Sequence, residues 1–313
     1  MAPTIVITIL NEAHSLSKLL NALAGQTLGP SQILIVDGGS TDAGPDMVRA
    51  FAQKHPRLNL TLLSKPGNRS IGRNEGIEQA LTELVAITDA GCIPQPDWLE
   101  KLVAAQRKSG AAVVAGYYTA KPTTAFEEAV VPYALVMPDA LDPDHFLPAT
   151  RSMLILKSAW LAAGKFDVSL SDNEDYAFAH ALVRAQQPMV FAREAVVVWQ
   201  PRNSLRAFAW MIFRFARGDV RAGIIRPKVL LIFARYLIGG AGAIWLIGWA
   251  GLTVALWVSA VAITMYMLWA IKKNLRYVPR GWLWLPVLQI VSDVAVMLGS
   301  LAGALQLARS RQR

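Results

Sequence analysis

An acidic residue stands directly after the apolar segment at residues 84–88. This segment, LVAIT, is apolar with a β-branched end, so it predicts a buried strand. Asp89 follows it, and the small residues Ala90 and Gly91 come next. A carboxylate at a strand end with so little side-chain bulk around it faces open space and needs a partner. Asp89 is therefore a candidate functional residue.

Two glycine-containing segments have compositions suited to binding a ligand. DGGSTD begins with Asp37 at a strand end; its glycines let the backbone approach a ligand, and Ser40 or Asp42 can cap the next helix. An ordinary turn with good capping residues would have the same composition. GNRSIGRNEGI places Arg69 and Arg73 between glycines ahead of a helical stretch, which suits a phosphate. Neither GxxxxGK[ST] nor GxGxxG occurs, so the sequence carries no P-loop or dinucleotide fingerprint.

A pair of acids, Glu174 and Asp175, begins the helical segment EDYAFAHAL. Acids at such a position could take part in proton transfer. They are also favoured there by the helix dipole, which stabilises negative charge at a helix N-terminus. The residues alone therefore favour a capping role for this pair.

Residues 1–201 alternate short β-branched runs with helical stretches. TIVITIL, QILIVDGG, LNLTLLS, LVAITDA and AAVVAGYY read as strands, and helical segments separate most of them. This alternation predicts a mainly parallel sheet flanked by helices. In open sheets of this kind, ligands bind at the carboxyl ends of the strands. Those ends are NE, DGGSTD and DAGC, which places the acids and glycines at one edge.

The composition excludes several classes of site and partner. The chain has 313 residues, of which 54% are hydrophobic, and its one cysteine, Cys92, excludes an intrachain disulfide. Its four histidines are scattered, so a histidine-held metal is not expected. The net charge of +9 is uneven, because residues 1–201 carry 16 Lys and Arg against 20 acids, and residues 202–313 carry 15 against 2. Positive charge beside apolar segments favours an anionic membrane surface over nucleic acid.

Residues 229–271 contain one charged residue, Arg235, in 43 positions. About 20 helical residues cross a bilayer core, so this run predicts two transmembrane helices, at about 229–248 and 251–271, with a turn at GWAG. A third segment, 283–306, contains Asp293, which either faces the bundle toward Arg235 or marks a re-entrant segment. The basic loop KKNLRYVPRG predicts a cytoplasmic connection, and with it a cytoplasmic N-terminal domain. The basic C-terminal tail conflicts with a third full span, and this alternative stays open.

Residues 202–228 hold seven Lys and Arg with one acid, interleaved with aromatic and aliphatic residues. The mixture predicts amphipathic helices at the membrane interface. The chain then divides into a cytoplasmic domain at 1–201, interface helices at 202–228 and a membrane domain at 229–313 with two or three transmembrane helices.

Six segments, in this order and spacing, resemble the family-2 inverting glycosyltransferases, in particular their bacterial membrane-attached branch. They are TILNE, ILIVDGGSTD, GRNEGI, ITDAGC, NEDYAFA and RFARG, and they cover roughly residues 3–220. The resemblance implies a GT-A fold, the α/β fold of nucleotide-diphospho-sugar transferases, followed by interfacial and transmembrane helices.

The resemblance also implies a donor site at the sheet edge. Asp89 matches the first position of the family's Asp-x-Asp motif, which would hold Mg²⁺ or Mn²⁺ on the donor diphosphate. Gly91 replaces the second aspartate, so one protein carboxylate would hold the metal together with oxygens of the nucleotide. The remaining donor-binding residues implied are Thr8, Glu12, Asp37, Gly39, Arg69 and Arg73.

On the acceptor side, Asp175 matches the family's general base and Glu174 would orient it. FLPATRSMLI contributes Arg151 and Ser152 as pocket residues, and Trp199 stands near a position where relatives have a metal-binding histidine. Residues 117–145 are expected to form an acceptor-side loop. Arg214 and Arg217 match an arginine-rich motif and would hold a phosphate of the donor or of a lipid acceptor.

The sequence thus predicts a multi-pass enzyme of the inner or plasma membrane. It would transfer a sugar from a UDP- or GDP-sugar to a lipid-linked acceptor at the cytoplasmic face, in glycolipid or polysaccharide biosynthesis. One alternative is a polyprenyl-phosphate glycosyltransferase, whose acceptor is the lipid phosphate itself. Another is a nucleotide-binding membrane scaffold or transporter without turnover.

Overall fold

The structure of the chain is a computed structural model that describes residues 2–310. It divides into two compact units. The first comprises Met1–Lys121 and Val136–Gln200, and the second comprises Pro122–Leu135 and Pro201–Arg313. Each unit is described by itself.

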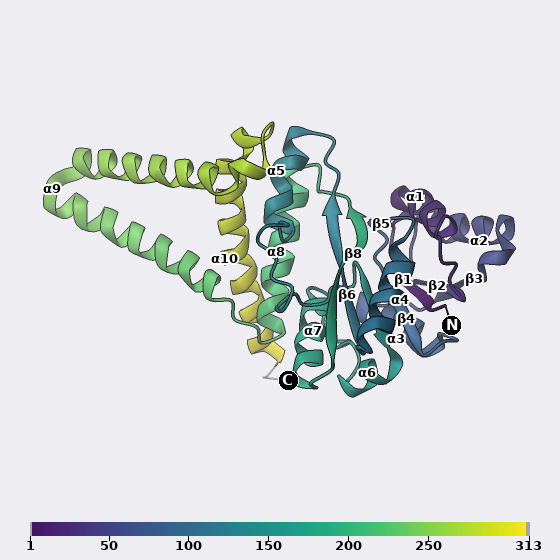
Figure 1. Cartoon of the computed structure of the whole chain (residues 1–313). Helices are drawn as coiled ribbons and strands as arrows, with labels where there is room; N and C mark the ends of the chain where they lie inside the picture. The colour runs from purple at the N-terminus through teal and green to yellow at the C-terminus, as the bar shows by residue number, and fades with distance from the viewer. Residues whose placement is uncertain (1, 311–313) are drawn as a thin grey trace. The chain divides into compact units, whose positions relative to one another are not determined.

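The first unit is built on an eight-stranded sheet with the order β3-β2-β1-β4-β7-β6-β8-β5 (Figure 1). Strands β1 to β4 are parallel, and β7 joins them antiparallel to β4; β6 pairs parallel with β8 and antiparallel with β7. The mixed sheet confirms the predicted fold class. The strands are β1 (Thr4–Ile9), β2 (Gln32–Asp37), β3 (Leu60–Ser64), β4 (Leu84–Ile87), β5 (Cys92–Pro94), β6 (Val113–Ala120), β7 (Met153–Leu156) and β8 (Met189–Trp199).

Helices alternate with these strands, as the sequence predicted. They are α1 (Ala13–Ala24), α2 (Gly44–Lys54), α3 (Arg69–Gln79), α4 (Trp98–Ser109), α6 (Lys157–Ala162) and α7 (Glu174–Arg184), with a 3-10 turn at Pro56–Leu58. The strand register pairs Ile9 with Asp37 and Asp37 with Ser64, so three strands end together at one edge. This edge carries the polar loops that follow β1 and β2.

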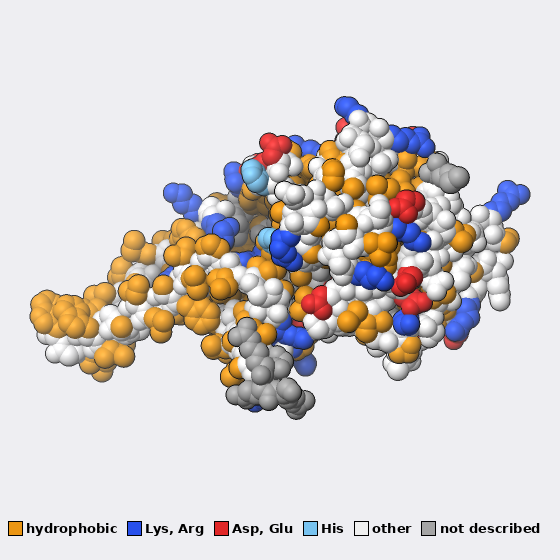
Figure 2. Space-filling view, turned by 90° about the horizontal axis from the view of Figure 1, so that it is seen from below, with side chains coloured by type: hydrophobic (Ala, Val, Ile, Leu, Met, Phe, Trp, Pro, Cys, Tyr) orange, Lys and Arg blue, Asp and Glu red, His pale blue; other side chains and the backbone are white. Residues whose placement is uncertain are grey.

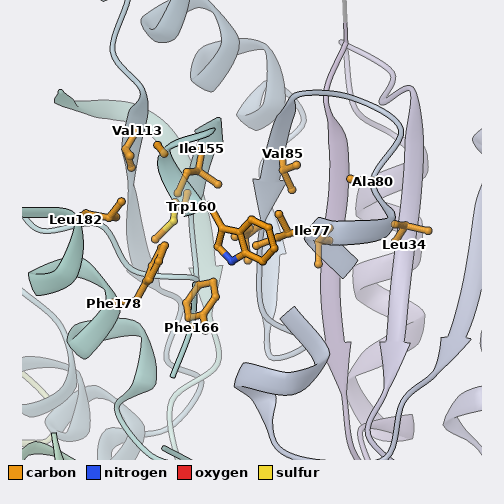
Figure 3. Close-up of a cluster of buried hydrophobic side chains, with 14 residues drawn as sticks. Leu34, Ile77, Ala80, Val85, Val113, Ile155, Trp160, Phe166, Phe178 and Leu182 are labelled. Atoms are coloured by element: carbon orange, nitrogen blue, oxygen red, sulfur yellow. The ribbon is translucent and has the colours of Figure 1, made fainter. Parts of the chain in front are cut away.

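The core of the first unit packs aromatic side chains against the sheet (Figure 3). Trp160, Phe166 and Phe178 are each 2% exposed, and the rings of Phe166 and Phe178 stack at 4.0 Å between centroids. Burying a side chain of this size stabilises the fold by roughly 2 kcal/mol. Because Phe178 lies on α7, this stack fixes α7 on the sheet.

The second unit is helical, with α5 (Ala125–Ala134), α8 (Leu205–Arg221), α9 (Pro227–Asn274) and α10 (Leu285–Ser310), and short 3-10 turns at Leu275–Tyr277 and Trp282–Trp284. The expectation of a loop at 117–145 was wrong for 125–134. There Thr124 caps α5 by accepting from Glu127 N, and two acids occupy the first turn.

Helix α9 folds back on itself (Figure 1). Gly251 has φ 84° and ψ 166°, a conformation that glycine adopts without a steric penalty and that breaks the helix into two arms. The break falls within GWAG, where the sequence predicted a turn. Hydrophobic side chains cover the arms (Figure 2), and those of Ile244 and Trp249 are 74% exposed.

Helix α10 packs along α8 through its small residues. A Cβ atom at Gly299 would collide with the carbonyl of Phe213, and one at Gly303 would lie 2.8 Å from the carbonyl of Arg217. The two glycines therefore permit the close approach that their spacing predicted. Two segments, Pro227–Tyr277 and Trp282–Arg309, are long and apolar enough to cross a membrane.

Candidate active site

A buried arginine joins two acids from distant parts of the chain. Arg73, on α3, donates from Nη1 to Glu174 Oε1 at 2.6 Å and from Nη2 to Asp89 Oδ1 at 2.9 Å. The side chains of Arg73 and Glu174 are 2% and 4% exposed, so both charges lie out of water and compensate each other. Asp89 therefore has an ion-pair partner within the chain that the sequence did not predict. Arg73 organises the acids of the site.

The aromatic core holds Arg73 in this position. Its Cζ lies 5.6 Å from the centroid of the Phe166 ring, and Phe166 stacks on Phe178. Phe178 follows Glu174 by one helical turn, so both side chains point from the same face of α7. The packing of α7 on the sheet thereby brings Glu174 onto Arg73, although they are 101 residues apart in the sequence.

Asp175 is half-buried beside this ion pair. Burial raises the pKa of its carboxyl above the ordinary value, and the negative charge of Glu174 raises it further, against the opposing effect of Arg73 and Arg151. A raised pKa makes a carboxylate a stronger base, which suits proton transfer near neutral pH. The arrangement can thus provide a general base at Asp175.

Asp89 keeps one carboxylate oxygen for a ligand. Arg73 and Thr150 both donate to Oδ1, at 2.9 Å and 3.2 Å, and no hydrogen bond from the described residues reaches Oδ2. Its side chain is 33% exposed. Burial opposes ionisation of Asp89, but the charges of Arg73, Arg69 and Arg151 outweigh it and hold its pKa below the ordinary value. Asp89 is therefore an ionised carboxylate.

These features fit a divalent cation that is shared with a substrate. Among residues 2–310, no three His, Cys, Asp or Glu side chains come together in a cluster that could hold a metal. Mg²⁺ is often bound by one or two carboxylates together with substrate phosphates, so Asp89 alone could serve. A Cβ atom at Gly91 would meet nothing within 4 Å, so there is open space where the family's second aspartate would stand.

Arg151 lies between two aromatic rings next to this edge. Its Cζ is 5.1 Å from the ring centroid of Tyr118 and 5.5 Å from that of Trp199. Trp199 is 6% exposed and serves as a wall beneath the guanidinium. Ser152 is fully buried; its hydroxyl accepts from Trp98 Nε1 at 2.8 Å and donates to the carbonyl of Ala195 at 3.1 Å. This geometry gives Ser152 a role in packing, and its predicted role in a pocket stays a prediction.

A hollow of about 340 Å³ opens beside Asp37 at the carboxyl ends of β2 and β3. Asp37 accepts from Ser40 N at 3.0 Å, which shapes the loop after β2, and Gly39 takes a positive φ of 102° in that loop. Arg49 contributes a cation to the wall. The full lining is Asp37, Ser40, Asp42, Pro45, Asp46, Arg49, Leu62 and Ser64.

The loop after β2 is tied to the end of β1 by side chains that the sequence analysis missed. Asn11 Oδ1 accepts from Thr41 N at 2.8 Å, and Asn11 N donates to Ser40 Oγ at 2.9 Å. Asp42 accepts from Ala13 N at 2.9 Å. A positive φ of 55° at Asn11 was not foreseeable, although asparagine tolerates it better than most residues.

The remaining predicted residues lie on several elements. Thr8 is half-buried in β1, Glu12 precedes α1 with its side chain 26% exposed, and Arg69 is the exposed first residue of α3. In contrast, Asp89, Arg73, Glu174 and Asp175 come together in one electrostatic cluster.

Arg214 and Arg217 belong to α8 of the second unit, where Arg217 Cζ lies 5.9 Å from the Trp210 ring and 5.6 Å from the Phe213 ring.

Comparison with known proteins supports the predicted family resemblance. Residues 4–142 match the family model described as Glycosyl transferase family 2. Glycosyltransferase AglE of Haloferax volcanii is 32% identical over 115 residues, which cover 36% of this chain and 38% of AglE. The succinoglycan biosynthesis protein ExoA of Rhizobium meliloti is 28% identical over 229 residues, covering 69% of this chain and 68% of ExoA. The match thus spans little more than a third of the first relative.

Solved structures share the fold. Mannosyltransferase PcManGT from Pyrobaculum calidifontis, solved in complex with GDP-Man and Mn²⁺, superimposes with a TM-score of 0.60 at 21% identity, covering 95% of this chain and 88% of that one. Residues 1–349 of TarS from S. aureus, in complex with UDP-GlcNAc, give a TM-score of 0.55 at 14% identity, covering 96% and 91%. Identities this low establish the GT-A fold alone. Together with the matched family model, they confirm the predicted resemblance: residues 4–142 carry a glycosyltransferase family 2 domain.

Proposed function

We propose that the chain is an inverting glycosyltransferase that moves a sugar from a nucleotide-diphosphate donor to a lipid-linked acceptor at a membrane. One observation carries the proposal. The buried ion pair of Arg73 and Glu174 places a carboxylate with a free oxygen, Asp89, and a carboxyl with a raised pKa, Asp175, in one electrostatic cluster. An ion pair with only a structural role would need Glu174 but not Asp89 and Asp175 beside it.

The donor is proposed to bind along the edge from β2 to β4. The hollow beside Asp37 has room for a nucleoside, and the Asp37 carboxylate can accept a hydrogen bond from a base N–H. PcManGT binds GDP-Man and TarS binds UDP-GlcNAc in structures of the same fold, which supports a nucleotide-sugar donor here. Asp89, at the end of β4, would hold Mg²⁺ or Mn²⁺. When bound, such a cation neutralises the charge of the leaving diphosphate.

Asp175 is proposed as the general base. It would take the proton of the acceptor hydroxyl while that oxygen attacks the anomeric carbon from the side opposite the diphosphate, which inverts the configuration. Glu174 cannot share this task, because Arg73 binds its Oε1 at 2.6 Å in a buried pair. We assign Glu174 to position Arg73 and, by its charge, to raise the basicity of Asp175.

The two arms of α9 are proposed to cross the membrane. Each arm is longer than the about 20 residues that a span needs, and each carries exposed apolar side chains, such as Leu237 on the first arm and Trp257 on the second. Helix α10 instead packs along α8, which carries Arg206, Arg214, Arg217 and Arg221. A helix with four arginines is not stable in hydrocarbon, so α10 would lie at the surface.

Two crossings return the C-terminus to the side of residues 1–201. Protease accessibility of a C-terminal tag in sealed, oriented vesicles tests this topology.

A polyprenyl-phosphate glycosyltransferase is the second candidate. Residues 202–313 carry 15 basic residues against 2 acids, and this positive charge favours a phosphorylated acceptor. A phosphate oxygen is already ionised at neutral pH, so such an enzyme would depend less on Asp175.

Turnover of UDP-, GDP- and dTDP-sugars by the purified full-length chain tests the proposal. We expect release of the nucleotide diphosphate from one of these donors, and faster release with a long-chain polyprenyl diphosphate-sugar acceptor. Binding of a donor without turnover, both with and without the acceptor, would instead support a scaffold that only binds nucleotide.

A further inference from the structure

Two basic side chains from the two arms of α9 meet at one aromatic ring. Arg235 Cζ lies 5.8 Å from the centroid of the Trp269 ring, and Lys273 Nζ lies 5.2 Å from it. Arg235 is also 4.6 Å from the ring of Tyr266. Like charges repel, so two cations on one ring are stable only with a compensating negative charge or an electron-rich ring between them.

The nearby acid, Asp293, compensates only part of this charge. It is fully buried and accepts hydrogen bonds from the hydroxyls of Tyr236 and Tyr266 and from Gln289 Nε2. Neutral donors therefore occupy both of its oxygens, and Arg235 Nη1 stays at 3.9 Å from Oδ2. One acid faces two cations in this cluster.

Other arginines of the same unit show what a structural pair looks like. Arg226 makes two hydrogen bonds to Asp219, at 2.6 Å and 3.0 Å, and Arg280 binds Glu128 at 2.7 Å. Arg235 Nη1 stays 3.9 Å from Asp293 Oδ2, about 1 Å beyond these distances and too far for a hydrogen bond. Its guanidinium thus keeps donors for another group, as an arginine dedicated to a structural pair would not.

Donors rather than acceptors are in surplus around the two cations. Asn274 follows Lys273 in the chain and is 4% exposed, and its Nδ2 has no acceptor among the described residues. Lys273 Nζ contacts one oxygen, Gln289 Oε1, at 3.4 Å. The buried Asn274 donor is costly without an acceptor, and the exposed Lys273 ammonium is accessible to an anion. An anion with several oxygens would satisfy them.

We propose that Arg235, Lys273 and Trp269 form a binding site for the terminal phosphate or diphosphate of a lipid. The site rests on the proposed function, in which α9 enters the membrane. A lipid is favoured over a free phosphate because both arms of α9 carry exposed apolar side chains, among them Leu237 and Leu268 at 70% and 60% exposed, that offer contact to an acyl or prenyl chain. Arginine and lysine with an aromatic ring supply the charge-assisted bonds that a phosphate needs.

Binding of a long-chain polyprenyl phosphate to the full-length chain in neutral phosphatidylcholine vesicles tests the site. Lys273→Gln removes one cation without touching Asp293, and we expect it to weaken binding roughly tenfold, as loss of one charge-assisted contact does. Lys272→Gln is the matched control, because Lys272 is an exposed neighbour of the same charge. Asp293→Asn retains acceptors for the tyrosine hydroxyls, removes the competing charge and should tighten binding.

Three results would overturn the proposal: equal losses with Lys272→Gln and Lys273→Gln, weaker binding with Asp293→Asn in a chain that stays folded by circular dichroism, or inorganic phosphate binding as tightly as the lipid. Phosphatidylglycerol vesicles that compete fully would also overturn it, because bulk anionic lipid would then suffice. Donor hydrolysis measured on the same samples reports the proposed function, so each hypothesis can fail without the other.

Discussion

Arg73 and Glu174 form an ion pair of 2.6 Å between α3 and the start of α7, and both side chains are almost completely buried. The pair connects the donor side of the sheet, where Arg73 also binds Asp89, to the acids at positions 174 and 175. Removing one partner of such a pair leaves the other charge buried and uncompensated, which is more costly than replacing both. The site is therefore sensitive to the identity of a residue that need not touch the substrate.

Replacing Arg73 by methionine should destabilise the protein by about 3–5 kcal/mol, the usual cost of breaking a buried pair. Without the guanidinium, burial dominates at Asp89 and should raise its pKa above the ordinary value. A carboxyl with a raised pKa in the folded state is more stable protonated, so the variant should gain stability as the pH falls toward 5. Urea denaturation at pH 7 and pH 5 measures both effects.

Arg69→Met is the matched control for this prediction, since Arg69 stands on the same helix and is exposed. It should change stability little, because exposed charges contribute little. Similar losses of stability for both variants would show that the positive charge of α3, and not the buried ion pair, stabilises the protein.

Asp175→Asn should lower sugar transfer by roughly 10²–10⁴-fold, the usual effect of removing a general base. Nucleotide affinity should stay within a few-fold, because the base acts on the acceptor. The raised pKa of Asp175 predicts that wild-type transfer falls as the pH drops through that pKa. Steady-state rates from pH 5 to 9 and nucleotide titration measure these effects. An exposed acid, Asp144, provides the control Asp144→Asn.

Stability separates this catalytic role from a structural one. A folded pKa above the unfolded value means that the folded protein binds more protons, so Asp175 lowers stability as the pH rises through that window. Asparagine removes this cost, and the variant should be as stable as wild type or more stable at pH 7. A large loss of stability with Asp175→Asn would speak for a structural acid.

Gly91→Asp should raise the apparent affinity for Mn²⁺ or Mg²⁺ in the presence of donor. The added side chain has room, because no atom lies within 4 Å of the Cβ position. Gly91→Asn controls for size without charge. Asp89→Ala should abolish both transfer and the response to added metal. Full wild-type activity in excess chelator would show that Asp89 serves the donor without a cation.

Arg214→Ala and Arg217→Ala should each reduce transfer sharply while membrane insertion and folding persist, if these arginines hold a phosphate. Arg206→Ala is the control, because Arg206 is exposed on the same helix. Arg226 is unsuitable as a control, since it binds Asp219 through two hydrogen bonds. Equal and small effects at the three positions, stronger only at low salt, would mean that α8 is an electrostatic anchor.

Much of the fold follows from local pattern. The β-branched runs and the loops that end them predicted the strands and their ligand edge, because period and turn chemistry are properties of neighbouring residues. The break at Gly251 and the close packing at Gly299 were foreseeable for the same reason. An acid in an apolar segment requires a partner, so Asp293 was expected either to face Arg235 or to mark a re-entrant segment; Arg235 Nη1 and Asp293 Oδ2 lie 3.9 Å apart.

The details of the site depend on contacts between distant segments, which no local pattern shows. Arg73 was predicted to help hold the donor, and this stays a prediction; its bonds to Asp89 and Glu174, 16 and 101 residues away, were not predicted. Ser152 was predicted to line a pocket, and the bonds of its hydroxyl to Trp98 and Ala195 in the core were not predicted. An arginine or a serine has the same local signal in either role, and only the tertiary packing decides between them.

The anomeric configuration of the product tests the central claim most directly. The full-length chain in vesicles, given its donor and a lipid-linked acceptor, should form a glycosidic bond whose configuration is opposite to that of the donor, as read from the anomeric proton coupling by NMR. The same reaction with Asp175→Asn should form almost no product. A product that retains the donor configuration, or product formed at the wild-type rate by Asp175→Asn, would contradict an inverting transfer with Asp175 as its base.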